Sequence, residues 1–304
     1  MRALWVALCL GCAAAHGYEA DIHQQLTFLA AKQLNRCVEG SNVEPLTPLQ
    51  VRYIARSNVA LADSNLFVRM FRWSYYDPTG RERNLLWLIS TRFSAHFADL
   101  VAGLERAEPE PDGYRELGRI ISYVQLVSAP AHAVPVYTGR FWRWNIGDRF
   151  DDYPLDAAAV EAALGEDCGF LQPLAESYEA ELAASAAGTL VAVSKPIGGL
   201  PATWEAFWRL PAEPGTFGEY GPAGNNFGRR AEFPCVRSAT AGSTEQPKRK
   251  RCVLLEDDPL YDEFARNRHV SAVRHTARVM LLYQVNHTHQ PEQPDGQGDS
   301  DRAE

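Results

Sequence analysis

The chain has 304 residues, of which 46% are hydrophobic and 22% charged, a composition typical of a globular protein with a large core. Its formal net charge is −8 at pH 7. Proteins that bind duplex nucleic acid usually carry clustered Lys and Arg, so this acidic charge argues against such binding. The sequence contains neither a Gly-rich phosphate loop nor a Gly-x-Ser-x-Gly elbow, so a serine-hydrolase function has little support.

The N-terminus has the features of a cleavable export signal. An Arg and a short apolar stretch are followed by small residues, with candidate cleavage sites after Ala15 and after Gly17. Cleavage after Gly17 leaves Tyr18 as the first residue of the mature chain. The apolar stretch is too short to span a bilayer. We therefore expect residues 1–17 to be a signal peptide and the mature protein to be secreted or periplasmic.

Hydrophobic residues repeat at helical spacing through most of the mature chain. Asp21 and Thr47 are expected to cap the first two helices, and Pro130 to end the fourth. A turn is expected at residues 77–80. Helices are expected at about 22–34, 48–63, 85–104, 114–129, 157–164, 174–187 and 258–285.

Two later segments lack this periodicity. Residues 195–255 are rich in Gly, Pro and aromatic residues, and no alternating β pattern of useful length is found there. The acidic tail, 291–304, is expected to be disordered. The sequence therefore predicts one all-α domain over residues 18–290, with an irregular insert at about 195–255.

Four cysteines remain in the mature chain: Cys37, Cys168, Cys235 and Cys252. An even number in an exported protein favours disulfides, with three alternative connectivities, over four buried free thiols. Cys235 and Cys252 flank a single loop, so we expect them to pair. Cys37 is expected to pair with Cys168 if both are oxidised.

Several polar residues occur at characteristic spacing along the predicted helices. His23 follows Tyr18 by five residues, and Asp63 ends the second helix. A helix over 117–129 leads to Pro130-Ala131-His132, and Asp148-Arg149-Phe150-Asp151-Asp152 follows. With these motifs the chain, from Tyr18 to about Tyr283, resembles the zinc-dependent phospholipase C and single-strand-specific nuclease family.

The resemblance implies an exported multi-helix bundle that hydrolyses phosphodiesters with a metal-bound water. The family holds three zinc ions through the free N-terminal amine and carbonyl together with His, Asp or Glu side chains. Carried over by position, it implies a catalytic role for Asp63. It also implies these zinc ligands: Tyr18, His23, Asp63, His132, Asp148 and Asp151, with Asp152 as an alternative closing acid.

Four positions depart from the family pattern. The last His of the cluster is missing, and its candidate positions are Thr138 and the stretch around Asp148. Ser74 and Ser122 replace imidazole ligands, and Leu126 replaces the bridging carboxylate. Zinc binds imidazole, thiolate or carboxylate groups, usually four for each ion. We therefore expect one or two zinc ions at most. One would lie at the N-terminus with His23, and the other at His132 with the acids of 148–151. A single ion with an open position can still activate water.

Each candidate also has a structural interpretation. His23 is then a polar residue on the flank of a helix, Asp63 a helix-end residue, and His132 a partner for backbone groups at a helix break. No functional role is predicted for the four histidines on or beyond the last helix: His269, His275, His287 and His289.

Three functions from different classes remain open. The first is an exported hydrolase of phosphoric ester bonds with a reduced zinc site, acting on a phospholipid or another phosphodiester. The second is a catalytically impaired protein that binds a phosphorylated ligand or a lipid. The third is an interaction protein that uses aromatic loops at 141–144 and 204–208. The acidic charge and these aromatic residues favour contact with lipid, including a membrane surface, or with protein.

Overall fold

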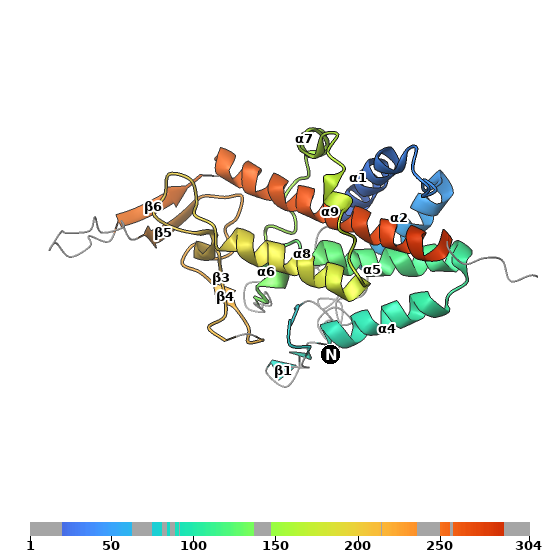
Figure 1. Cartoon of the computed structure of the whole chain (residues 1–304). Coiled ribbons are helices and arrows are strands. Elements are labelled where there is room, and N and C mark those ends of the chain that lie inside the picture. Colours follow the sequence, from blue (N-terminus) through green and yellow to red (C-terminus); the bar gives the residue numbers. More distant parts are fainter. Residues whose placement is uncertain are drawn as a thin grey trace, which may run out of the picture.

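The computed structural model describes residues 20–62, 75–80, 84–85, 89–90, 92–136, 147–213, 215–235, 250–255 and 258–288. This part of the chain is mostly helical, as expected (Figure 1). The helices are α1 (Ala20–Val38), α2 (Pro48–Ala62), α4 (Phe93–Arg106), α5 (Tyr114–Leu126), α6 (Pro130–Ala133), α7 (Ala157–Leu164), α8 (Tyr178–Val193) and α9 (Pro259–Thr288). Single turns form η1 (Pro109–Gly113), η3 (Gly169–Leu171) and η4 (Trp204–Ala206). The predicted signal peptide, Tyr18, Asp63, Ser74 and the acidic tail lie outside the described residues.

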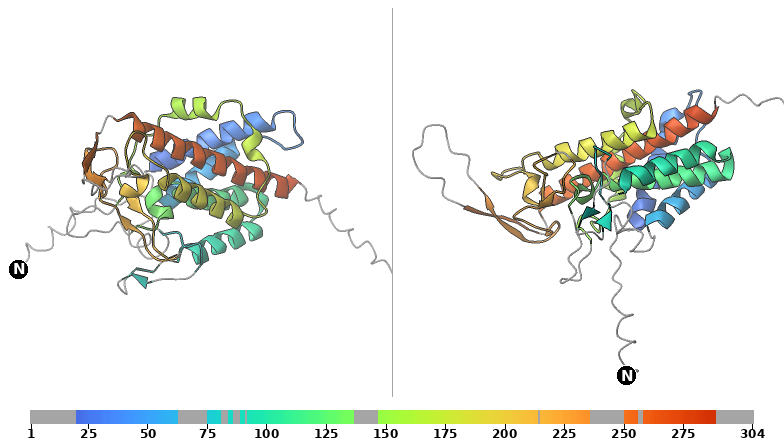
Figure 2. Two further views of the ribbon diagram at one scale, coloured as in Figure 1. Left: turned by 60° about the vertical axis from the view of Figure 1, so that its left-hand side comes forward. Right: turned by 90° about the horizontal axis from the view of Figure 1, so that it is seen from below.

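Helix α5 lies at the centre of the bundle and packs against α2, α4, α8 and α9. Five of its hydrophobic side chains are completely buried: Leu117, Ile120, Ile121, Tyr123 and Val124. The close approach of α2 requires a glycine in α5, because a Cβ atom on Gly118 would lie 2.3 Å from the carbonyl oxygen of Ile54. The long α9 runs beside α8 in all three views of Figures 1 and 2 and also contacts α1 and α5.

Both predicted disulfides are present. Cys37 at the end of α1 is bonded to Cys168, which precedes η3. Cys235 is bonded to Cys252 across a hairpin of β5 (Ala231–Cys235) and β6 (Lys250–Leu254). No helix in the described ranges combines the length and apolarity needed to cross a membrane.

The predicted Thr47 cap is found at the start of α2, and the predicted turn is found at residues 77–80. The cap predicted at Asp21 was wrong, because α1 already includes Ala20 and Asp21 lies in the first turn of the helix. Thr47 and Gln50 form a reciprocal capping box, in which each side chain accepts a hydrogen bond from the other's backbone N–H. The Gly80 N–H donates to the Asp77 carbonyl oxygen at 3.1 Å and closes the turn.

Several predicted boundaries were wrong. The helix expected at 85–104 begins only at Phe93, and Leu85 pairs with Ile89 between the short antiparallel strands β1 (Asn84–Leu85) and β2 (Ile89–Ser90). A spacing of four fits one helical turn as well as the two arms of a tight hairpin, so periodicity could not separate them. Helix α5 ends at Leu126, before Pro130, which instead begins α6. Helix α8 starts later than predicted because Ser177 caps it, accepting from the Ala180 N–H at 3.2 Å.

The insert at 195–255 was expected to be irregular, and this was also wrong in part. In β5 the buried side chains alternate with exposed ones, because one face of the hairpin covers the core. A second antiparallel pair joins β3 (Trp208–Arg209) to β4 (Glu219–Tyr220). Trp204 and Trp208 are buried, and the ring of Trp204 lies 4.2 Å from that of Phe264 in α9. These tryptophans therefore pack largely inside the molecule, and the loop at 141–144 lies outside the described residues.

Candidate functional site

The predicted site residues within the described ranges lie in two hydrogen-bonded groups. One surrounds His23 of α1, and the other contains His132 of α6 with Asp148 and Asp151 from the segment that precedes α7. All four side chains are buried. Tyr18 and Asp63, the other two residues expected to join them, lie outside the described residues.

His23 belongs to a polar network in the core. Its Nδ1 atom lies 2.6 Å from the Oε1 atom of Gln125 in α5, which also accepts from Asn58 of α2 at 2.9 Å. The Gln125 amide nitrogen donates to the hydroxyls of Thr27 at 3.2 Å and Thr276 at 3.3 Å. Because a carboxamide oxygen only accepts, Nδ1 of His23 carries the hydrogen in this bond. The network therefore fixes the tautomer and orientation of His23.

Gln125 is the residue of this network that sequence reasoning missed. It is completely buried, directly before Leu126, in a helix whose other inward residues are mostly apolar. A buried carboxamide must find partners, because an unpaired polar group in the core costs free energy. A glutamine among the apolar residues of the last turn of this helix was the available signal.

His132 and Asp151 form the second group. The Nε2 atom of His132 lies 3.2 Å from Oδ2 of Asp151, and both side chains are buried. The other oxygen of Asp151, Oδ1, is buried without a hydrogen-bond partner among the described residues. A buried carboxylate oxygen without a partner is costly and marks this position as a candidate for binding.

Asp148 lies beside this pair, but its own oxygens are already engaged. Its Oδ2 atom accepts from Trp208 Nε1 at 2.9 Å and from the Tyr220 hydroxyl at 2.8 Å, and its Oδ1 atom accepts from the Phe150 N–H at 2.8 Å. Burial, with the nearby charge of Asp151, raises the pKa of Asp148 to about 6 even though these hydrogen bonds favour the ionised form. Asp148 thus anchors strands β3 and β4 to the segment before α7.

The donor set does not fit the three-ion centre that the resemblance implies. Leu126 and Ser122 are both buried in α5, where a carboxylate and an imidazole would be required. His132 and Asp151 supply two donor side chains, and Asp148 is committed to other partners. Within the described ranges, no three His, Cys, Asp or Glu side chains are grouped so that they could hold a metal ion.

A cavity of about 340 Å³ lies next to the His132–Asp151 group. Its walls come from the turn at 75–80, the end of α6, α8 and the loop before β4, and they include Tyr75, Tyr76, Leu190, Leu210 and Phe217. The Tyr76 N–H donates to the His132 carbonyl oxygen at 3.1 Å, so one wall is joined directly to the second group. We call it the Tyr75–Phe217 cavity.

The Tyr75–Phe217 cavity is predominantly apolar. Asp77 is the single charged residue that lines it among the described residues, and its Oδ1 atom accepts from both the backbone and the hydroxyl of Thr79. The rings of Tyr75 and Phe217 meet edge to face at 5.5 Å. Such a surface favours an apolar or aromatic ligand that carries no net negative charge.

The chain was also compared with known proteins. No protein-family model, curated protein or solved structure matches it.

Proposed function

We propose that this protein is an exported, catalytically impaired relative of the phospholipase C and nuclease family that binds a phospholipid. In this proposal an apolar part of the lipid enters the Tyr75–Phe217 cavity, and the lipid is not cleaved. The observation that carries the proposal is the apolar cavity joined to the His132–Asp151 group, where the described residues supply too few metal donors for the family's chemistry.

The cavity's size and charge support a specific kind of lipid. A volume of about 340 Å³ is near the lower end of the range of ligand pockets, which suits a short segment of acyl chain better than a whole lipid. The carboxylate of Asp77 in its wall would repel an anionic head group. A neutral or zwitterionic phospholipid therefore fits best.

Export is supported by the covalent structure. The two disulfides, Cys37–Cys168 and Cys235–Cys252, are stable in oxidising compartments and rare in the cytosol. They agree with the export signal at residues 1–17, and we propose a secreted or periplasmic location.

A cavity-blocking variant tests lipid binding. Ala212 lines the cavity but is exposed, so Ala212→Trp should fill the entrance without disturbing the core. We expect the affinity for a fluorescent short-chain phosphatidylcholine to fall by roughly 10-fold or more, because several apolar contacts are lost. Ala158→Trp, at an exposed position of α7, is the matched control and should bind like the unaltered protein. Equal affinity in Ala212→Trp and Ala158→Trp would show that the lipid does not bind in the Tyr75–Phe217 cavity.

The second candidate is a phosphodiester hydrolase with one zinc ion. The unpartnered Oδ1 atom of Asp151, beside His132, favours it. Such an ion would need further donors from outside the described residues. Zinc analysis of the secreted, processed protein separates the two candidates. A zinc content that falls in His132→Ala, together with loss of phosphodiester hydrolysis, would favour the hydrolase.

A further inference from the structure

A second hollow, of about 700 Å³, lies against α9 on a different part of the molecule. The end of α8, the turn at 195–198 and η4 form its other walls. The rings of Trp204 and Phe264, whose centroids lie 4.2 Å apart, give it an apolar floor. We call it the α9 groove. Within the part of the chain that the structure describes, it shares no lining residue with the Tyr75–Phe217 cavity.

The α9 groove is positively charged on an acidic protein. Lys195, Arg268 and Arg274 line it, and Glu263 is its single acid among the described residues, whereas the whole chain has a formal charge of −8. The Lys195 side chain is exposed and makes no hydrogen bond or ion pair within the described ranges. Arg274 lies 3.9 Å from the exposed carboxylate of Asp167, a weak contact. A local excess of positive charge in a concave surface attracts anions.

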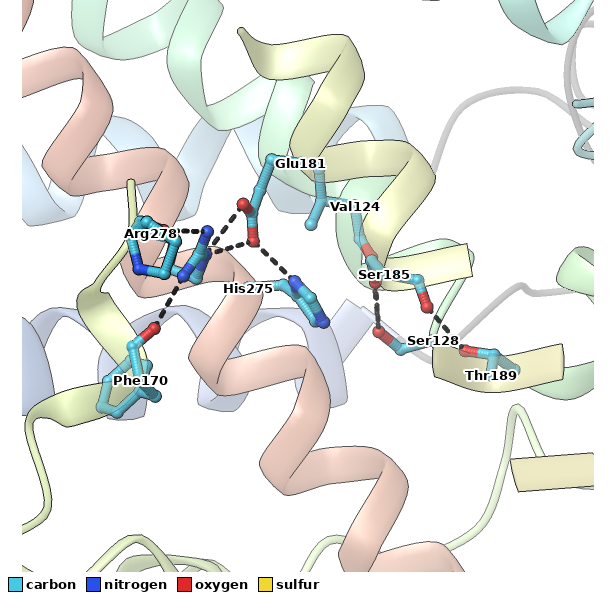
Figure 3. Close-up of polar contacts among 9 residues, drawn as sticks. Val124, Ser128, Phe170, Glu181, Ser185, Thr189, His275 and Arg278 are labelled. Atoms are coloured by element: carbon cyan, nitrogen blue, oxygen red, sulfur yellow. Dashed lines mark hydrogen bonds and ion pairs between the residues drawn. The ribbon is translucent and has the colours of Figure 1, made fainter. Parts of the chain in front are cut away.

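His275 lines the same groove and is held by a buried carboxylate. Its Nδ1 atom lies 2.6 Å from Glu181 of α8, which also accepts from Arg278 Nε at 2.8 Å (Figure 3). Arg278 in turn donates to the carbonyl oxygens of Phe170 and Pro173, at 2.8 and 2.7 Å. Burial alone would raise the pKa of Glu181, but the hydrogen bonds and charges of His275 and Arg278 outweigh burial and lower it.

The contact with Glu181 fixes the orientation of the His275 ring and leaves its Nε2 atom available to a ligand. Figure 3 shows Nε2 of His275 directed away from Glu181. Arg278 forms an ion pair with Glu181 at 2.8 Å, so the charge of this buried carboxylate is balanced beside the groove. Ser271 lies one helical turn before His275 on the same face of α9 and lines the groove with a hydroxyl that has no partner within the described ranges.

We propose that the α9 groove is a binding site for an organic phosphate monoester. The phosphate would lie among Lys195, Ser271 and His275. Arg268 and Arg274, which also line the groove, would add positive charge. The organic part would contact the floor formed by Trp204 and Phe264. The site is separate from the Tyr75–Phe217 cavity and does not depend on the function proposed for it.

Calorimetric titration of the mature protein with phenyl phosphate tests the site. We expect saturable binding that weakens roughly 3- to 10-fold in Lys195→Ala, since one partly exposed charge contact is lost. A loss of similar size is expected in Ser271→Ala. Among the described residues, neither side chain has a partner that its removal would leave unpaired, so both variants should fold. Lys32→Ala removes the same charge from an exposed position of α1 and should bind like the unaltered protein.

Inorganic phosphate serves as a second probe in the same titration. Weaker binding of inorganic phosphate than of phenyl phosphate is expected, because the apolar floor contributes only to the latter. Equal affinity for phenyl phosphate and inorganic phosphate would show that the rings of Trp204 and Phe264 do not bind the organic part of the ligand. No saturable binding of either, or equal losses in Lys195→Ala and Lys32→Ala, would overturn the site itself.

Discussion

Replacing Gln125 by Leu tests whether the buried polar network stabilises the fold. The side chain of Gln125 makes hydrogen bonds of 2.6 Å to His23, 2.9 Å to Asn58, 3.2 Å to Thr27 and 3.3 Å to Thr276. These partners come from α1, α2 and α9, so Gln125 joins the central helix to three others. Leu has nearly the same volume and removes the amide with little change in packing.

The expected loss follows from counting bonds. A buried hydrogen bond contributes about 1 kcal/mol net, so the four bonds amount to about 4 kcal/mol. Such a loss is a large share of the roughly 5–15 kcal/mol by which proteins are stable. With an m-value of about 3 kcal/mol/M, the urea midpoint should fall by about 1.3 M.

Urea denaturation followed by circular dichroism measures this change. The control is Gln24→Leu, the same substitution at an exposed position of α1, which should change the free energy of unfolding by no more than about 0.5 kcal/mol. A loss below about 1 kcal/mol in Gln125→Leu would refute the reasoning, because so small a cost is that of a single hydrogen bond.

Three further predictions concern the hairpin, Asp148 and the metal site. The double variant Cys235→Ser with Cys252→Ser should lose about 3 kcal/mol in urea denaturation, since the disulfide closes a loop with a separation of 17 residues. Burial raises the pKa of Asp148 from 3.8 to about 6, so the stability that protonated Asp148 contributes should be complete below pH 3.8 and lost as the pH rises through about 6. In Asp148→Asn the urea midpoint should therefore depend less on pH over that range. A pH profile like that of the unaltered protein would contradict this. If the family scaffold is the one we propose, Leu126→Asp with Ser122→His should raise the zinc content found by atomic emission, because both side chains then lie on one face of α5. An unchanged zinc content would count against that scaffold.

The helices were predictable where hydrophobic periodicity coincided with a cap. Thr47 followed by Pro48 correctly predicted the start of α2, and α7 was found at its predicted bounds over Ala157–Leu164. Periodicity failed where a short apolar run folds back on itself, as between Leu85 and Ile89. It also overlooked β5, because a five-residue strand shows little more than two alternations.

The candidate site was less predictable, because its contacts join distant segments. His132 and Asp151 were expected near each other and are in contact, 19 residues apart. The engagement of Asp148 by Trp208 and Tyr220 depends on the β3–β4 pair, which the sequence did not reveal. His275 was given no role, because its partner Glu181 lies 94 residues earlier in the chain. Contacts at such separations depend on how the helices pack, which single-sequence patterns do not specify.

Phosphorus-31 NMR of a short-chain phosphatidylcholine, below its micelle concentration and with zinc present, tests the central claim most directly. We expect the mature protein to broaden the resonance of the intact lipid, and we expect no new resonance over hours. Ala212→Trp should abolish the broadening, since it fills the entrance of the Tyr75–Phe217 cavity. A new resonance from a released phosphorylated head group, or an intact-lipid resonance that the protein leaves unchanged, would contradict the central claim.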